Sequence, residues 1–322
     1  MSPSHAASTP GPDARPPSSP SIWPAACALG ALAAAVRSVA WLRTAALFDD
    51  GPIFLTLAQA ILDGDWSSVL RHPYHPLYPA LVAAGSALGL GLEEAGAAVS
   101  IASGALAVVA FTAWVDDAFG RSTAWIGGAM LALHPFAVSF SADVQSDGLY
   151  MALFLWSAFF LYRAPRSERA AAALAGGGFS GLAYLARPEG LGLAVLAGIA
   201  GAAWIAFDPG ARRRRVRGLA VALLAAAVPV AVYMGALESE TGAVQLTQKK
   251  SVRALAGVGE ADSPAPGSSL AEPAALPRAS DPPPPETTAG RLALAARDLY
   301  RSAVSVLRFE LLPFLALGVF AA

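Results

Sequence analysis

The sequence has few charged residues and a single cysteine. Only 14% of its 322 residues are Asp, Glu, Lys or Arg, whereas soluble domains carry about 25%. A formal net charge of −1 provides no basic surface of the kind that binds nucleic acid. Cys27 has no second cysteine with which to form an intrachain disulfide, so cysteine usage does not indicate a compartment. Because 55% of the residues are hydrophobic, the composition predicts an integral membrane protein.

The N-terminus also lacks the basic region that begins a secretory signal peptide. Residues 1–21 are rich in Pro and Ser, and the apolar run that follows is longer than the apolar part of a signal peptide. We therefore expect a disordered tail over residues 1–21, followed by an uncleaved first transmembrane helix.

Long apolar runs predict a bundle of membrane-spanning helices. A transmembrane helix needs about 20 residues, and an open sheet cannot satisfy its backbone hydrogen bonds in lipid. We therefore predict an all-α, polytopic transmembrane helix bundle over residues 22–255. The expected spans are residues 22–47 (interrupted by Arg37 and Arg43), 76–92, 95–115, 122–142, 148–162, 170–186, 190–207 and 218–237.

The C-terminal part of the chain has a different composition. Residues 256–290 are rich in Pro and Ala, cannot bury a core and are typical of a low-complexity loop. Residues 291–322 mix arginines with apolar residues, which favours an interfacial helix followed by the start of a further span. Because the sequence ends inside that apolar run, we expect it to be the N-terminal part of a longer protein.

Arginine-rich loops predict the orientation of the bundle. The stretch "RAPRSER" at 163–169 has three arginines, and "DPGARRRRVR" at 208–217 has five. The positive-inside rule places both loops on the cytoplasmic side. The helical hairpin between the two loops then carries its tip, Arg187-Pro188-Glu189, to the outer side.

The same orientation brings five charged residues to the outer surface. Charged side chains near hydrocarbon are costly, by about 2.5–3.5 kcal/mol at a helix centre, and those that occur usually face a cavity or a partner. Arg and Lys near helix ends have an alternative, since they can extend to lipid headgroups. The five residues are Asp147, Arg187, Glu189, Lys249 and Lys250.

Two adjacent carboxylates, Asp49 and Asp50, begin the stretch "DDGPIFLTLAQAILDGDW" after the first span. The apolar residues that follow recur at helical spacing, which predicts a short amphipathic helix at the membrane interface. Three apolar segments separate this pair from Asp147, so one must fail to cross if both lie outside. We expect that segment to be 122–142, because Pro135 breaks it. The segment 76–92 is the second candidate, and a cytoplasmic acidic pair is the alternative.

Histidine and tyrosine accompany prolines in the next stretch, "RHPYHPLYPAL" at 71–81. His75 and Tyr78 could bind a phosphate or a sugar, although interfacial tyrosines commonly serve as anchors. His72 and His75 have a spacing found in metal sites, but the sequence offers no third ligand.

These stretches together resemble the GT-C glycosyltransferases related to the lipid A aminoarabinose transferase and the protein O-mannosyltransferases. The acidic pair and its amphipathic helix are similar to the first external loop of that family, "SADVQSDGLYMALFLW" to its next acidic motif, and "GLAYLARPEGLGL" to its glycine-rich helix ending in a basic residue. The resemblance covers roughly residues 22–240. Ile53 stands where the family often has Tyr, and Asp50 where Glu is commoner. The large external C-terminal region of some members has no counterpart here, so acceptor recognition is undefined.

The resemblance implies an outward-facing glycosyltransferase of a bacterial inner membrane. It would transfer a sugar from a polyprenyl-phosphate donor to a lipid, glycan or protein acceptor. Asp49 would take the proton of the acceptor hydroxyl, with Asp50 in support, and Arg187 would hold the phosphate with its bidentate fork. Asp147 would bind the sugar or position a cation, and a divalent cation is left open as a cofactor. The other substrate-binding residues implied are His75, Tyr78, Glu189, Lys249 and Lys250.

Two other classes of protein share some of these features. A transporter or channel also has broken helices and charged residues near the membrane, but it predicts an internal repeat and charges at mid-membrane, which the sequence does not show clearly. A non-catalytic fragment is the third interpretation.

Overall fold

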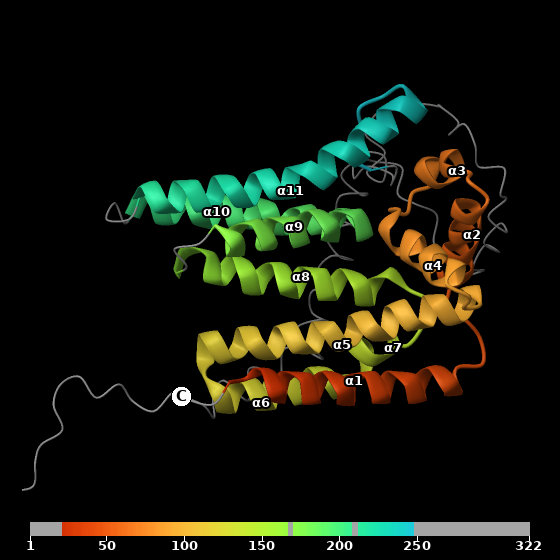
Figure 1. Cartoon of the computed structure of the whole chain (residues 1–322), viewed down its shortest axis with the longest axis horizontal. Helices are drawn as coiled ribbons and strands as arrows, with labels where there is room; N and C mark the ends of the chain where they lie inside the picture. The colour runs from red at the N-terminus through yellow and green to blue at the C-terminus, as the bar shows by residue number, and fades with distance from the viewer. Residues whose placement is uncertain (1–20, 167–169, 208–211, 248–322) are drawn as a thin grey trace, which may run out of the picture. The chain divides into compact units, whose positions relative to one another are not determined.

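The computed structural model describes residues 21–166, 170–207 and 212–247. Within these ranges the chain forms α-helices, 3-10 turns and loops, and no strand (Figure 1). The predicted all-α fold is therefore confirmed for the described part of the chain. The predictions for residues 1–20, 256–290 and 291–322, and those for Lys249 and Lys250, lie outside the described residues.

Most of the described helices lie side by side and form a bundle (Figure 1). They are α1 (Trp23–Arg43), α5 (Leu92–Phe119), α6 (Arg121–Leu133), α8 (Ser146–Arg163), α9 (Ala171–Ala186), α10 (Leu191–Phe207) and α11 (Arg212–Thr241). Of the described helices, α1, α5 and α11 have the length and apolar composition to cross a membrane. The bundle therefore agrees with the predicted polytopic membrane protein.

Glycines allow α9 and α11 to approach closely. A Cβ added at Gly177 would overlap the carbonyl oxygen of Ala222, and one added at Gly181 would lie 2.7 Å from the carbonyl oxygen of Ala226. Helices in lipid associate mainly through close packing of this kind, because lipid is as apolar as the helices themselves. A larger side chain at either glycine would separate the two helices.

Three short helices lie together beside one end of the bundle (Figure 1). They are α2 (Gly51–Leu62), α3 (Trp66–Arg71) and α4 (Leu77–Ala87). Helix α2 is the expected amphipathic helix, since its apolar residues Phe54 and Leu57 are buried while Thr56 is exposed. It begins with a proline in its first turn, where a missing backbone N–H costs no helical hydrogen bond.

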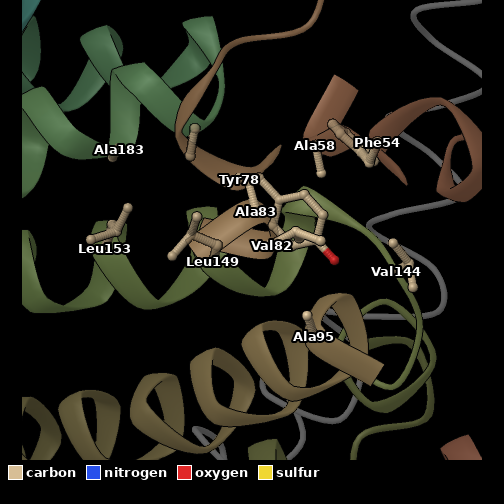
Figure 2. Close-up of a cluster of buried hydrophobic side chains, with 11 residues drawn as sticks. Phe54, Ala58, Tyr78, Val82, Ala83, Ala95, Val144, Leu149, Leu153 and Ala183 are labelled. Atoms are coloured by element: carbon tan, nitrogen blue, oxygen red, sulfur yellow. The ribbon is translucent and has the colours of Figure 1, made fainter. Parts of the chain in front are cut away.

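A buried apolar cluster joins these short helices to the bundle. Phe54 from α2, Tyr78 and Val82 from α4, Leu149 from α8 and Ala183 from α9 all belong to it, and Figure 2 shows them around Tyr78. Because one core includes the starts of α2 and α8 and the end of α9, it fixes the charged residues at those helix ends relative to one another.

Polar contacts identify the two ends of the bundle. At the first end, Arg121 at the start of α6 donates to the carbonyl of Ser21, which precedes α1 (3.3 Å). We call this the arginine end, because α11 begins there with its run of arginines (Figure 1). At the second end, the backbone amide of Phe48 after α1 donates to Asp143, which precedes α8 (3.0 Å). We call this the acidic end.

The segment that fails to run the length of the bundle is 76–92, the second of the two sequence candidates. It forms α4, which has 11 residues and is therefore only about 16 Å long. Helix α4 stays at the acidic end, packed against α2 and α5. The expectation for 122–142 is wrong: it breaks at Pro135, but α6 and then α7 (Pro135–Ser139) still return the chain to the acidic end.

Arg37 explains why the break between α6 and α7 is tolerated. Its fully buried guanidinium donates to the carbonyls of Ala132 at 3.1 Å and Ala137 at 3.4 Å, on either side of the break. It also donates to the hydroxyl of Ser141 at 2.6 Å. Backbone groups that a proline frees inside a membrane need such partners. Arg37, which the sequence showed only as an interruption of the first span, thus holds the broken segment.

Candidate active site

The acidic pair lies in the loop between α1 and α2. Asp50 is the residue before α2, is half-buried, and accepts a hydrogen bond from the hydroxyl of Tyr74 at 2.7 Å. Asp49 is exposed, and its carboxylate has no hydrogen bond or ion pair with the described residues. The two carboxylates therefore differ: one is held in place, and the other is accessible from solvent.

Asp143 also holds this loop, through the backbone amide of Phe48. Asp143 is 8% exposed, and its two carboxylate oxygens accept hydrogen bonds from the backbone amides of Phe48 at 3.0 Å and Val144 at 2.6 Å. Sequence reasoning missed Asp143, because the acidic motif was assigned to Asp147, four residues later. The available signal was a second carboxylate in "SADVQSD".

Asp147 and Arg187 form an ion pair between the start of α8 and the end of α9. Arg187 has an extended backbone, with φ −153° and ψ 139°, because the residue before a proline is disfavoured in a helix. The chain then makes a 3-10 turn over Pro188–Gly190, which brings Glu189 to 3.7 Å from the Nε of Arg187. The structure thus brings together Asp147, Arg187 and Glu189, as the predicted orientation requires.

The electrostatics of this group connect it to the acidic pair. Asp147 precedes the apolar run of α8, and partial burial raises the pKa of its carboxyl. The positive charge of Arg187 opposes that increase in the pKa, whereas the negative charge of Asp50 adds to it. Asp50 therefore lies close enough to Asp147 to raise the pKa of the Asp147 carboxyl. The side chains of Asp147 and Arg187 are 36% and 29% exposed, so a ligand can reach them.

The structure places His75 and Tyr78 in buried positions. His75 is 2% exposed, and its ring nitrogens contact the carbonyl of Tyr184 at 2.6 Å and the hydroxyl of Thr247 at 3.3 Å. Tyr78 is fully buried, and its hydroxyl contacts Gly96 at 3.1 Å. A phosphate or a sugar would have to displace these contacts. The tyrosine that touches the acidic pair is Tyr74, which the sequence prediction passed over.

The described residues contain no group of three or more His, Cys, Asp or Glu side chains placed to hold a metal ion. His72, the partner of His75 in the metal spacing, instead accepts a hydrogen bond from the backbone amide of Tyr74 at 3.2 Å.

A protein-family model matches just over half of the chain. The family is described as dolichyl-phosphate-mannose-protein mannosyltransferase, and the match extends over residues 71–237. This range includes Asp147 and Arg187, whereas the acidic pair precedes it. No curated protein and no solved structure matches the chain significantly.

Proposed function

The chain belongs to the dolichyl-phosphate-mannose-protein mannosyltransferase family, and we propose that its acidic end is the active site, facing outward from the membrane. Family membership makes the chain a multi-pass membrane glycosyltransferase that uses a sugar linked to a lipid phosphate. The proposal adds the residues that act and the face on which they act. Family membership also favours an enzyme over a transporter or channel.

The observation that carries the proposal is the grouping of two carboxylates and one arginine at the acidic end. Asp50, Asp147 and Arg187 come from three separate helix ends, and the buried cluster of Figure 2 holds those ends together. An arginine beside carboxylates can bind a phosphate while the carboxylates bind hydroxyl groups. A sugar phosphate presents both kinds of group.

The reaction needs a base and a stabiliser for the leaving group. In the proposed mechanism, the acceptor hydroxyl oxygen attacks the anomeric carbon of the sugar and its proton passes to Asp49. The bond between that carbon and the phosphate oxygen breaks, and the polyprenyl phosphate leaves with the electron pair. Arg187 stabilises the negative charge that develops on the phosphate. Asp50, held by Tyr74, orients the acceptor, and Asp147 binds the sugar hydroxyls.

The distribution of arginine supports an outward-facing active site. Arg121, Arg163 and the arginines of α11 all lie at the arginine end, opposite the acidic end. The positive-inside rule favours a cytoplasmic position for the arginine end. The acidic end then faces outward, where the acceptor is a lipid, a glycan or a protein.

Transfer from a defined donor tests the proposal. The full chain would be reconstituted in vesicles with radiolabelled polyprenyl-phosphate mannose, since the family description names mannose, and with an extract of envelope acceptors. We expect the wild type to transfer label and Asp49→Asn to lose transfer while inserting normally. Full activity of Asp49→Asn would contradict the assignment of the base. Glu240→Gln, a change at another carboxylate of the acidic end, serves as the control.

A further inference from the structure

An apolar cavity of about 770 Å³ lies between helices at the arginine end, away from the acidic pair. Its walls come from α5, α8, α9, α10 and α11, with side chains that include Trp114, Phe154, Leu161, Leu196 and Leu219. A cavity of this size and composition fits part of an acyl chain rather than a small polar molecule.

Four arginines from the start of α11 line the same cavity: Arg213, Arg214, Arg215 and Arg217. Among the lining residues that the structure describes, none is acidic. The cavity therefore combines an apolar interior with a concentrated positive charge.

The indole of Trp114 provides a second polar group. It also contributes to the lining, and its buried Nε1–H has no hydrogen-bond partner among the described residues. A buried donor without an acceptor costs about 1–3 kcal/mol. A ligand with an ester carbonyl could supply that acceptor.

We propose that this cavity binds one anionic phospholipid from the membrane leaflet at the arginine end. The acyl chain occupies the apolar interior, and the phosphate lies among the arginines, whose planar donors suit phosphate oxygens. Basic pockets between transmembrane helices are known to take anionic headgroups.

The lipid site is separate from the proposed active site. Helix α11 has 30 residues, so its two ends are about 45 Å apart. The arginines lie at its start, whereas Glu240 near its end contacts Ser67 at the acidic end (2.9 Å). A donor phosphate at Arg187 therefore cannot be the phosphate that the α11 arginines hold.

Photolabelling in vesicles tests the lipid site. The full chain would be reconstituted in phosphatidylcholine with a small fraction of phosphatidylglycerol bearing a photoreactive acyl chain, and labelled peptides from α10 and α11 would be quantified. We expect Arg217→Gln and the cavity-filling Ala197→Phe to lower labelling at least threefold, and Arg217→Lys to retain most of it. Two matched changes outside the lining, Arg212→Gln and Val195→Phe, should leave labelling unchanged.

Competition separates a lipid from a free anion. Unlabelled phosphatidylglycerol should suppress the labelling, whereas inorganic phosphate and soluble glycerol phosphate should not. Three outcomes would overturn the proposal: equal labelling by photoreactive phosphatidylcholine, displacement by inorganic phosphate alone, or an equal loss in Arg212→Gln. None depends on glycosyl transfer, so the lipid site and the active site can fail independently.

Discussion

Asp147 and Arg187, 40 residues apart in the sequence, form an ion pair between the start of α8 and the end of α9. Exposed ion pairs contribute only about 0–1 kcal/mol to stability, and both side chains are partly exposed. The pair therefore adds little to stability, and our proposed explanation for it is a binding site.

Replacing Arg187 tests that explanation. We expect Arg187→Ala to lower kcat/KM for the lipid-linked donor by about 10²–10³, the usual loss for one group that stabilises a developing negative charge. Arg187→Lys should recover part of that loss, because lysine keeps the charge without the fork. The control is Arg163→Ala, which breaks an ion pair at the arginine end. If both variants lose activity equally, the effect is structural.

The pKa of Asp147 should respond in opposite directions to its two charged neighbours. Burial raises this pKa, Arg187 opposes the increase, and Asp50 adds to it. Arg187→Ala should therefore raise the pKa further, so that Asp147 takes up a proton at a higher pH, and Asp50→Asn should lower it. Infrared titration of the carboxyl band, with Asp147→Asn to assign the band, measures both shifts without requiring activity. A pKa that stays constant in Asp50→Asn would show that the two carboxylates do not interact.

Tyr74 and Tyr78 should have separable effects. Tyr74→Phe removes the hydrogen bond to Asp50 and should lower the transfer rate about tenfold, with little change in Tm. Tyr78→Phe removes hydrogen bonds inside the buried cluster and should cost about 1 kcal/mol of stability, without changing KM. The transfer rate and the thermal unfolding of both variants check this prediction. A lower transfer rate in Tyr78→Phe with an unchanged Tm would mean that Tyr78 belongs to the active site.

We expect that α4 does not cross the membrane, so the acidic pair and the start of α5 should lie on the same side of it. In a Cys27→Ser background, single cysteines at Asp63 and Leu88 should react with a membrane-impermeant thiol reagent from the same side. A cysteine at Phe119, exposed at the other end of α5, should react from the opposite side. Labelling of the Leu88 cysteine from the side opposite to the Asp63 cysteine would mean that α4 crosses.

We expect Arg37 to stabilise the segment that is broken between α6 and α7, and to take no part in the reaction. Arg37→Met leaves the carbonyl of Ala132 without this donor, at about 1–3 kcal/mol for a buried group, whereas the carbonyl of Ala137 keeps its hydrogen bond from Ser141. Gly104→Val should act similarly, because a Cβ there would overlap Arg37 and Ser141. Gly178→Val, where the space is open, is the matched control. Proteolysis near residues 133–141 and thermal unfolding measure the effect, and normal stability of Arg37→Met would contradict it.

Much of the fold could be predicted because lipid imposes a simple rule. A chain with long apolar runs must form helices there, since no other open structure satisfies its backbone in hydrocarbon. Composition therefore predicted the all-α bundle, and the period of the apolar residues after Asp50 predicted α2. The arginine-rich loops predicted that Asp147, Arg187 and Glu189 share one end, and their ion pairs agree with that prediction. The roles of these residues stay predictions.

The side-chain contacts could not be predicted from the sequence, because they depend on tertiary structure. Tyr74 and Tyr78 are alike in sequence, but Tyr74 lies in a loop beside Asp50, and Tyr78 lies on the buried face of α4.

Sequence by itself determined which segments are helical and where charge accumulates, because those depend on local composition and on transfer from water to lipid. Which segment fails to run the length of the bundle, and what Arg37 and Asp143 hold, was decided only in the folded chain. The contacts of Arg37 and Asp143 depend on partners that lie 95 or more residues away in sequence, such as Ala132 for Arg37 and Phe48 for Asp143. Local patterns carry no information about such distant hydrogen-bond partners.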